Sequence, residues 1–290
     1  MKIRKGIILA GGYGTRLYPI TKSISKHLLP VYDKPMIYYP LTTLMIAGIK
    51  EILIICTPLD IDRFKKLLGN GDQWGIKIYY EVQNVPDGIV SAFIIGKRFL
   101  KNSPCALILG DNIFYGDQFG QKMKKAQDDL KGSVIFGYHV KDPERYGVIE
   151  LDDNNVVIDI EEKPKDPKTN CVATGLYFYD SQVCEFASSM KPSPRGELEI
   201  TDLNKIYIKK KLLKVELLSR GNVWFDTGTN DSLLEASTFI YTIQKRLGLM
   251  IACPDEIALK SNWIDMKIFR SNQKSLENTS YGEYLNEIKL

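Results

Sequence analysis

Three glycines and an arginine follow a short apolar run in the segment GIILAGGYGTRLYPIT (residues 6–21). A loop that only has to turn needs fewer glycines, so this number indicates that a ligand comes close to the backbone. The freed N–H groups can converge on phosphate oxygens, Arg16 can add a planar fork matched to two of them, and Lys26 supplies a mobile charge. The spacing predicts a nucleoside triphosphate site whose backbone amides come from Gly11, Gly12 and Gly14.

Two other glycine-rich phosphate loops fit this segment less well. A P-loop requires a lysine and a Ser or Thr directly after its last glycine, and no lysine stands at that spacing. A dinucleotide-binding loop has the pattern G-x-G-x-x-G, and Leu17 stands where the third glycine belongs when counting starts at Gly12. That glycine permits close packing of helix on strand. Its absence weakens the interpretation as a dehydrogenase but leaves it open.

Alternating strands and helices must position the glycine loop. Apolar runs rich in Ile, Val and Tyr predict buried strands at 6–10, 51–57, 76–82 and 105–110. Helical spacing of apolar residues occurs between them, at roughly 36–48, 60–69 and 88–101. This order predicts βαβ units and a mostly parallel sheet covered on both faces. Ligands bind beyond the carboxyl ends of such strands, which is where the glycine loop begins.

Beyond residue 130 the pattern changes to closely spaced strands, which predict a partly antiparallel section of the sheet. A strong helix follows, with capping-box spacing between Ser232 and Glu235 and a stop at Gly248. We predict an α/β fold: a Rossmann-like, mostly parallel (mixed) sheet flanked by helices, with a C-terminal helical appendage. The expected organisation is a core at 1–230, with halves at about 1–130 and 131–230, and a helical segment at 231–290.

Composition excludes several classes of function. The 290 residues carry 39 basic and 35 acidic side chains with the signs interspersed, which argues against nucleic acid as a partner. Five cysteines without a C-x-x-C pair indicate neither a disulfide framework nor a zinc site. No apolar stretch approaches the ~18 residues of a membrane span, and none resembles a signal peptide. We expect a reduced, soluble, cytoplasmic protein with no membrane partner.

The motifs, taken in order, resemble those of the sugar-phosphate nucleotidylyltransferases. The glycine loop and the following SKHLLP correspond to the family signature G-G-x-G-T-R-L-x-P-x-T…K-x-L-L-P. Further matches run along nearly the whole chain, at YDKPMIYYPL, LILGDNIF, DPERYGV, EEKP, TGLYFYD, KPSPRGELEITD and WFDTGT. The resemblance implies that glucose 1-phosphate attacks the α-phosphorus of dTTP and expels pyrophosphate with the help of Mg²⁺. The product would enter the synthesis of dTDP-rhamnose and other dTDP-deoxysugars.

The resemblance also implies a role for each residue of the nucleotide site. Arg16 would bind the departing β- and γ-phosphates, and Lys26 would lie against the α-phosphate. Gln83 can offer both a donor and an acceptor to the thymine edge. The implied catalytic residues are Arg16, Lys26 and Asp111, and the implied nucleotide-binding residues are Leu9, Gly11, Gly12, Gly14, Thr15, Arg16, Lys26, Gln83 and Gly88.

Two aspartates are candidates for the metal. Asp111 follows an apolar strand in LGDN, and Asp226 follows an aromatic run in WFDTGT. Taken alone, Asp226 before Thr-Gly is equally typical of a turn. The resemblance implies that both carboxylates bind Mg²⁺, a hard cation that bridges carboxylate and phosphate oxygens.

A separate group of residues is implied for the sugar phosphate. Lys163 would hold its phosphate, and Glu162 would accept hydrogen bonds from sugar hydroxyls, although EEKP alone is equally typical of an exposed turn. Arg195 would close over the site or simply lead into a helix. The implied sugar-phosphate residues are Asn112, Tyr146, Gly147, Glu162, Lys163, Thr174 and Gly175.

Two positions depart from the usual family pattern. His27 stands where some relatives have glutamine, and either nucleotide binding or a structural role fits it. Ser91 replaces a glutamine near the base, which puts the base or sugar preference in question and keeps as an alternative an enzyme of the same fold that uses UTP or another nucleoside triphosphate. A non-catalytic regulatory subunit is a second alternative. The resemblance further implies a homotetramer with a nucleotide-sugar feedback site, to which Arg220 and Glu256 are candidates.

Overall fold

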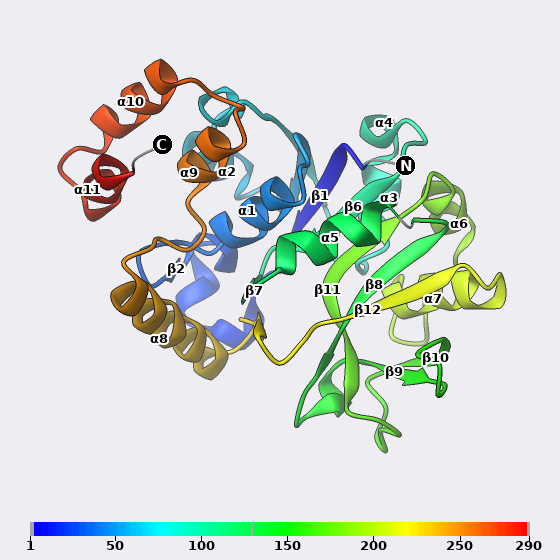
Figure 1. The fold of residues 1–290 in the computed structure, drawn as a ribbon. Coiled ribbons are helices and arrows are strands. Elements are labelled where there is room, and N and C mark those ends of the chain that lie inside the picture. Colours follow the sequence, from blue (N-terminus) through cyan, green and yellow to red (C-terminus); the bar gives the residue numbers. More distant parts are fainter. Residues whose placement is uncertain (1–2, 129, 289–290) are drawn as a thin grey trace.

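The computed structural model describes residues 3–128 and 130–288, and a nine-stranded mixed sheet forms its centre (Figure 1). Four neighbouring strands run parallel in the order β6-β1-β4-β5. Their bounds are β1 Lys5–Ala10, β4 Glu51–Cys56, β5 Lys77–Val82 and β6 Cys105–Leu109. The four strands predicted for the first half of the chain are therefore confirmed.

The second half of the chain extends this sheet with mostly antiparallel strands. Strand β11 lies antiparallel to β6, β8 and β9, β10 lies antiparallel to β9, and β12 runs parallel to β8. Their bounds are β8 Ser133–His139, β9 Gly147–Leu151, β10 Val157–Glu162, β11 Cys171–Tyr179 and β12 Leu213–Leu217. The expected partly antiparallel section is present.

Two short ribbons lie outside the main sheet. One pairs β7 with β13 in antiparallel fashion and the other pairs β2 with β3. Their bounds are β2 Pro30–Val31, β3 Lys34–Pro35, β7 Asn112–Gly116 and β13 Asn222–Asp226. The ribbon of β7 and β13 brings two segments more than 100 residues apart into register, from Asn112 opposite Asp226 to Gly116 opposite Asn222.

Helices cover both faces of the sheet and enclose two separate apolar cores. Neighbouring residues of β1 point to opposite faces, so that Ile8 packs beneath α1, α2 and α5 whereas Ile7 packs beneath α3, α6 and α7. The bounds are α1 Tyr38–Ile46, α2 Ile61–Leu68, α3 Ser91–Ile95, α4 Lys97–Leu100, α5 Phe119–Asp128, α6 Val183–Ser189 and α7 Ile200–Lys209.

The structure corrects two details of the predicted helices. The helical segment expected over 88–101 is divided into α3 and α4 at Gly96. Helix α8 (Asn230–Leu247) begins with a capping box formed by Thr229 and Ser232, so the predicted box of Ser232 and Glu235 is wrong by one turn. Gly248 ends the helix in a left-handed conformation (φ 66°), as predicted.

Three further helices form the C-terminal appendage beside α1 and α2 (Figure 1): α9 Pro254–Lys260, α10 Met266–Ser275 and α11 Ser280–Glu287. Asp255 is only 3% exposed and holds them to the core. Its carboxylate accepts hydrogen bonds from Trp74 Nε1 (3.1 Å), Tyr281 Oη (2.8 Å) and Asn272 Nδ2 (2.7 Å). The division of the chain at residue 230 stays a prediction.

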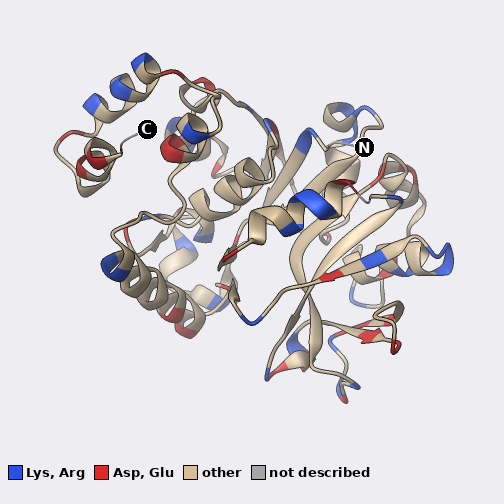
Figure 2. Cartoon of the chain, in the orientation of Figure 1, with Lys and Arg blue, Asp and Glu red and all other residues tan. Residues whose placement is uncertain are grey.

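Charged residues of both signs are interspersed over the helices and loops around the sheet (Figure 2). Within the described ranges, no helix has the length and apolar character needed to cross a membrane.

Candidate active site

The site begins where the carboxyl ends of β1 and β6 lie side by side. Leu9 is paired with Leu109, and Gly110 N donates to Leu9 O at 2.9 Å. The glycine loop leaves the sheet after β1, and Asp111 leaves it after β6. Because parallel strands end at one edge of the sheet, the two segments are brought together there.

The three glycines of the loop each have a different structural role. Gly14 adopts a left-handed conformation (φ 62°) and caps the short helix Thr15–Leu17. A side chain on Gly11 would overlap the amide oxygen of Gln83, so the group that approaches this glycine belongs to the protein itself. At Gly12 the nearest side-chain atom is Lys26 Cε, 3.9 Å from where a Cβ would lie. Gly12 therefore leaves open space beside Lys26.

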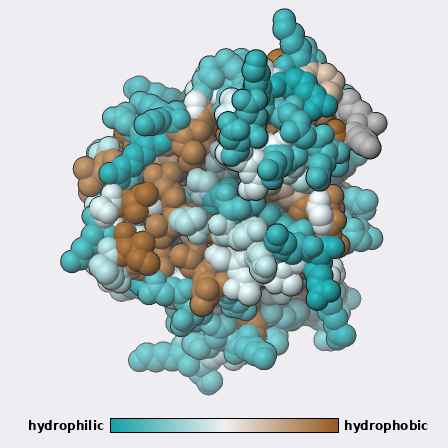
Figure 3. All heavy atoms as spheres, turned by 90° about the vertical axis from the view of Figure 1, so that its left-hand side faces the viewer, coloured by the Kyte–Doolittle hydropathy of each residue, from teal (hydrophilic) through white to brown (hydrophobic). Residues whose placement is uncertain are grey.

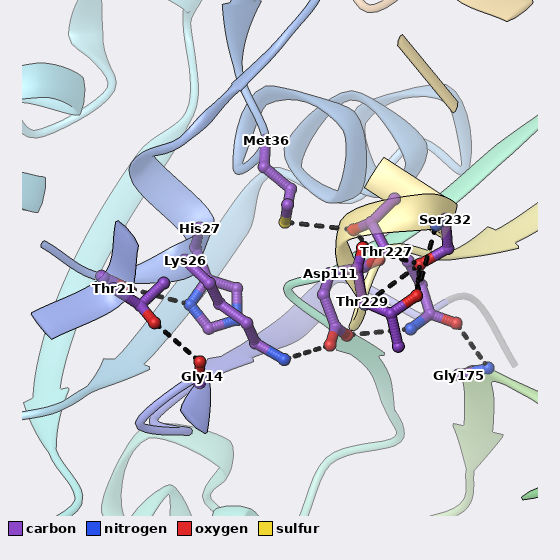
Figure 4. A network of polar contacts seen from close by, with 12 residues as sticks. Gly14, Thr21, Lys26, His27, Met36, Asp111, Gly175, Thr227, Thr229 and Ser232 are labelled. Carbon is purple, nitrogen blue, oxygen red and sulfur yellow. Dashed lines mark hydrogen bonds and ion pairs between the residues drawn. The ribbon is translucent and has the colours of Figure 1, made fainter. Parts of the chain in front are cut away.

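Lys26 and Asp111 form the ion pair at the centre of Figure 4. Both side chains are nearly buried, with 12% and 10% exposed. Burial alone would raise the pKa of the Asp111 carboxyl, but the Lys26 charge and a 3.0 Å hydrogen bond from Asn112 Nδ2 hold that pKa well below its usual range. Asp111 is therefore ionised throughout the physiological pH range.

Asp226 is the last residue of β13, so its interpretation as a turn residue is wrong. The register of β13 on β7 places it opposite Asn112 and near Asp111. Burial raises the pKa of Asp226, and the charge of Asp111 raises it further, whereas the charges of Lys26, Arg16 and Arg145 oppose the shift. The two carboxylates are thus close enough to repel each other.

Thr227 fixes the separation of the two aspartate-bearing segments. Its backbone N (3.0 Å) and Oγ1 (2.7 Å) both donate to Asp111 O. Figure 4 shows this residue between Asp111 and Met36. The ends of β6 and β13 are therefore held together before any ligand is bound.

A cavity of about 470 Å³ opens beside these residues. Ten predicted residues line it: Arg16, Asp111, Asn112, Tyr146, Gly147, Glu162, Lys163, Thr174, Gly175 and Asp226. All seven residues assigned to the sugar phosphate are in this group. The remaining wall, which the sequence interpretation missed, consists of Ile89, Leu109, Arg145, Ala173, Tyr177, Ile200, Thr201, Asn204 and Trp224.

Asn112 and Thr174 line this cavity, and polar groups of both side chains are already hydrogen-bonded within the protein. Asn112 Oδ1 accepts hydrogen bonds from Gly175 N (3.0 Å) and Trp224 Nε1 (2.6 Å). Thr174 Oγ1 donates to Phe136 O at 2.9 Å. These two residues therefore shape the cavity, and their remaining capacity for a ligand is small.

Glu162 and Lys163 present charges to the same cavity. Lys163 Nζ lies 3.4 Å from Glu162 Oε1, and the Lys163 side chain is 46% exposed. Thr201 Oγ1 donates to Glu162 Oε2 at 2.5 Å, and Arg195 Nη1 lies 3.9 Å from Oε1. Arg195 thus stands on the loop before α7 and also reaches the site. The i, i+3 spacing of Thr201 and Asn204 in EITDLN could have indicated this face of α7.

The residues assigned to the nucleotide lie next to the cavity, and Lys26 connects them to it. Arg16 is part of the cavity wall, and a side chain on Gly14 would come within 3.2 Å of Lys26 Cβ. Thr15 begins the short helix after the loop, and Gln83 follows β5 at the adjacent strand end. Gly88 O accepts a hydrogen bond from Ser91 Oγ, so it too lies near Gln83.

His27 lies behind Lys26 and is 2% exposed. Its Nδ1 lies 3.0 Å from Ser25 Oγ, and its ring packs against Gly110. Burial and then the Lys26 charge lower the pKa of His27 to about 3. A neutral ring of this kind supports the lysine and the strand end, which favours the structural role over nucleotide binding.

Replacing His27 by glutamine is expected to reduce the acid sensitivity of the fold. The pKa of His27 is 6.5 when unfolded and about 3 when folded, so protonation favours the unfolded chain as the pH falls below 6.5. Between pH 6.5 and 5 the wild type should lose about 2 kcal/mol of unfolding free energy through this group. Denaturant unfolding at several pH values measures the difference, with the exposed His139→Gln as control. Parallel pH profiles for wild type and His27→Gln would contradict it.

A sequence model of the nucleotidyl transferase family matches residues 5–242. Together with the fold and the site, this match shows that the chain belongs to the nucleotidyl transferase family of enzymes. The interpretation as a dehydrogenase is therefore wrong. The residues whose loss a non-catalytic subunit would predict, Arg16, Lys26, Asp111 and Asp226, are all present at one site.

Curated relatives match over almost their full length. The chain is 55% identical over 281 residues to the glucose-1-phosphate thymidylyltransferase of Neisseria gonorrhoeae, covering 97% of this chain and 98% of the relative. It is 55% identical over 285 residues to the enzyme of that name from Xanthomonas campestris pv. campestris strain B100, covering 98% and 97%.

Solved structures share the fold. A Bacillus anthracis protein described as a glucose-1-phosphate thymidylyltransferase, in complex with sucrose, is 42% identical with a TM-score of 0.76 and covers 81% of this chain and 94% of its own. A UDP-glucose pyrophosphorylase in complex with UDP-glucose is 27% identical with a TM-score of 0.73, covering 83% and 99%. The predicted α/β fold with a mixed sheet is thereby confirmed.

Proposed function

We propose that this enzyme transfers a thymidylyl group from dTTP to α-D-glucose 1-phosphate, forming dTDP-glucose and pyrophosphate. The proposal rests on the arrangement at one edge of the sheet. There Lys26 pairs with Asp111, and Asp111, Asp226 and Lys163 line a cavity of the size of a sugar. The near-full-length identity to relatives of that name supports the choice of substrates. The product would supply the synthesis of dTDP-deoxysugars such as dTDP-rhamnose.

The main obstacle to this reaction is the repulsion between two phosphate-bearing substrates. Cations that are already in position before the reaction reduce that repulsion without any rearrangement of the protein. Such positioning supplies most of the rate enhancement in phosphoryl-type transfers. In our proposal Lys163 holds the sugar phosphate, and Lys26 lies against the α-phosphate. Arg16 binds the two phosphates that leave as pyrophosphate.

The residues at the site fit a magnesium ion. Asp111 is a buried and Asp226 a half-buried carboxylate; burial and then the charge of Asp111 raise the pKa of Asp226, so a divalent cation held by both would relieve this unfavourable charge. Among the described residues no group of three or more His, Cys, Asp or Glu side chains could hold a metal alone. Two carboxylates that share the ion with substrate phosphates are a usual Mg²⁺ arrangement. When bound, the ion would neutralise charge on the α-phosphate.

A pyrophosphate-release assay tests the proposed function. The purified protein is incubated with glucose 1-phosphate and, in turn, dTTP, UTP, ATP, CTP or GTP, with and without Mg²⁺. We expect release with dTTP that requires both the sugar phosphate and the metal. Absence of release with every nucleotide would overturn the enzymatic proposal, and a preference for UTP would favour the second candidate.

That second candidate is a UTP-using sugar-1-phosphate nucleotidyltransferase. It is supported by the likeness of the fold to the UDP-glucose pyrophosphorylase that was solved with UDP-glucose. Thymine and uracil differ only in one methyl group, so a small change in the base site would be enough to exchange them.

We further propose a homotetramer with a feedback site for a nucleotide sugar. A second cavity of about 420 Å³ lies between α1, β7 and the segment from α8 to α9, and Glu256 is on its wall. Arg220 is not among its described lining residues. Figure 3 shows hydrophobic residues gathered on the side of the molecule that carries the C-terminal helices, as expected for a face between subunits.

Filling this second cavity is expected to weaken feedback inhibition. Ile46 lines it and is 49% exposed, so Ile46→Trp would occupy ligand space without disturbing the apolar core. We expect inhibition by dTDP-rhamnose to weaken about tenfold or more, because the wall then overlaps the ligand. Leu234→Trp is the matched control, since Leu234 is 68% exposed on α8 outside the cavity. Equal inhibition of both variants would contradict the proposed location.

We also propose that the enzyme works in the cytoplasm. All five cysteines are free and buried in the structure. Unpaired cysteines of this kind are typical of a reducing compartment.

A further inference from the structure

Gly228 lies between the end of β13 and the start of α8, directly beside the guanidinium of Arg16. A Cβ on this buried glycine would lie 2.6 Å from Arg16 Nη2 and 3.0 Å from Arg16 Cζ. Both distances are shorter than a van der Waals contact, so the guanidinium occupies the space that any side chain at position 228 would need. The next nearest atom to that Cβ is Asp226 Oδ1, at 3.1 Å. Gly228 therefore lets Arg16 approach the segment that carries Asp226.

Packing, rather than hydrogen bonding, orients the guanidinium of Arg16. Within residues 3–128 and 130–288, no group accepts a hydrogen bond from it and no carboxylate forms an ion pair with it. Arg16 is nevertheless part of the wall of the cavity of about 470 Å³. A guanidinium carries five N–H donors in one plane, so all of them can bind a ligand here. The contact with Gly228 thus helps to set where this plane lies.

The backbone around Gly228 is held on both sides and forms a firm support for the arginine. Thr227 donates two hydrogen bonds to Asp111 O, from its backbone N (3.0 Å) and from its Oγ1 (2.7 Å). Thr229 caps α8, since its Oγ1 accepts from Ser232 N at 3.2 Å and its backbone N donates to Ser232 Oγ at 3.1 Å. Because the backbone is fixed, a side chain added at position 228 would displace the arginine rather than the chain.

We infer that Gly228 is a positioning residue: it holds the guanidinium of Arg16 beside the Asp226 carboxylate but apart from it, so that the guanidinium donors face an oxyanion such as pyrophosphate. This inference rests on the proposed function and adds what orients the group that binds the departing phosphates. A guanidinium that closed onto the carboxylate would use its own donors and neutralise a candidate metal ligand. With glycine at position 228, the arginine has room to lie beside the carboxylate instead.

The test replaces Gly228 by alanine and measures kcat/KM for dTTP at saturating glucose 1-phosphate. The φ of Gly228 lies outside the left-handed region, and the three atoms nearest to the new Cβ all belong to side chains, so we expect the variant to unfold at the wild-type temperature. The value of kcat/KM for dTTP should fall about tenfold or more, because a small displacement of a positioned group is costly. The KM for glucose 1-phosphate should change less than about twofold, since Lys163 is assigned to its phosphate. A kcat/KM for dTTP equal to that of the wild type would overturn the inference.

Gly221→Ala is the matched control. Gly221 is exposed in the turn between β12 and β13, its φ also lies outside the left-handed region, and no heavy atom of the described chain lies within 4 Å of where its Cβ would be. We expect Gly221→Ala to match the wild type in kcat/KM. A loss as large as in Gly228→Ala would overturn the inference, because the effect would then not depend on contact with Arg16.

A double-mutant cycle shows whether the alanine acts through Arg16. Arg16→Met keeps an apolar stem but lacks the guanidinium that the new methyl group would displace. We therefore expect Gly228→Ala to change kcat/KM less than about twofold in the Arg16→Met background. A loss as large as in the wild-type background would show that the glycine acts through another group and would overturn the inference.

Pyrophosphate binding separates this inference from the proposed function. Calorimetric titration with inorganic pyrophosphate in the presence of Mg²⁺ probes the Arg16 site without turnover. If the wild type binds pyrophosphate but releases none from any nucleotide, and Gly228→Ala weakens binding about tenfold while Gly221→Ala does not, only the proposed function fails. If turnover occurs with dTTP but Gly228→Ala and Gly221→Ala bind pyrophosphate equally, only the inference fails.

Discussion

Replacing Lys26 by methionine is expected to lower kcat on the order of a thousandfold. Lys26 lies between the open space at Gly12 and the Asp111 carboxylate, where our proposal places the two phosphate groups that have to approach each other. Removing a preorganised group that stabilises developing charge costs about a hundred- to a thousandfold in turnover. Methionine keeps the length and apolar stem of lysine but not its charge. Steady-state pyrophosphate release measures the effect.

The Lys26→Met variant needs two controls. It leaves Asp111 buried without its cation, which costs about 3 kcal/mol of unfolding free energy, so turnover is measured well below the melting temperature. Lys22→Met removes an exposed lysine from the segment between the glycine loop and Lys26 and should change kcat less than about twofold. A Lys26→Met enzyme within about tenfold of the wild type would show that this lysine does not face the reacting phosphates.

Replacing Asp226 by asparagine is expected to lower kcat by about a hundredfold or more without loss of stability. Burial and the nearby Asp111 charge both raise the pKa of Asp226, so its ionised form is unfavourable in the folded protein. A neutral amide removes that repulsion and should leave the melting temperature equal or higher. It also removes half of the proposed Mg²⁺ site, which accounts for the loss of turnover.

Asp226→Asn is informative because we expect it to lower kcat while the melting temperature stays equal or rises. A residue that only supports the fold would lose stability and activity together. Asp231→Asn is the matched control, since Asp231 is an exposed carboxylate in the first turn of α8. Thermal unfolding and pyrophosphate release are measured on the same samples across a Mg²⁺ titration. An unchanged rate in Asp226→Asn, or an unchanged Mg²⁺ dependence, would show that the metal lies elsewhere.

Strands β1, β4 and β6 of the parallel half were predictable because they are largely buried on both faces and form continuous apolar runs in the sequence. GIILA and EILIIC contain little besides Ile, Leu and small residues, and they became β1 and β4. The capping box of α8 was displaced by one turn because Thr229, three residues after the end of β13, can cap the helix as well as Ser232 can. Local sequence patterns thus predict that a helix or strand is present more reliably than they predict its first residue.

The spacing of Thr201 and Asn204 indicates a polar face of α7, but the sequence does not show which part of the protein this face covers. Thr201 and Asn204 reach the cavity because α7 packs against β10, which carries Glu162 at its end. Nothing in the local sequence states which helix will cover a given strand. The residues assigned to the sugar phosphate were found because their motifs resemble those of the family, and the structure brings all of them to one cavity.

The role of Ser91 was equally hidden in the sequence. A serine in place of glutamine reads as a loss of one polar contact to the base. In the structure its hydroxyl bonds to both Gly88 O and Gln83 Nε2, and Asp87 Oδ1 accepts from the same Nε2. Such an arrangement depends on several groups meeting in space, and a comparison of residue types cannot supply it.

The most direct measurement is a crystal structure of the enzyme with glucose 1-phosphate and a non-hydrolysable dTTP analogue. Our account predicts the α-phosphate beside Lys26 and the sugar phosphate beside Lys163, with the terminal phosphates on Arg16 and the open backbone at Gly12. Phosphates bound at another edge of the sheet, with Arg16 and Lys26 left in solvent, would contradict it.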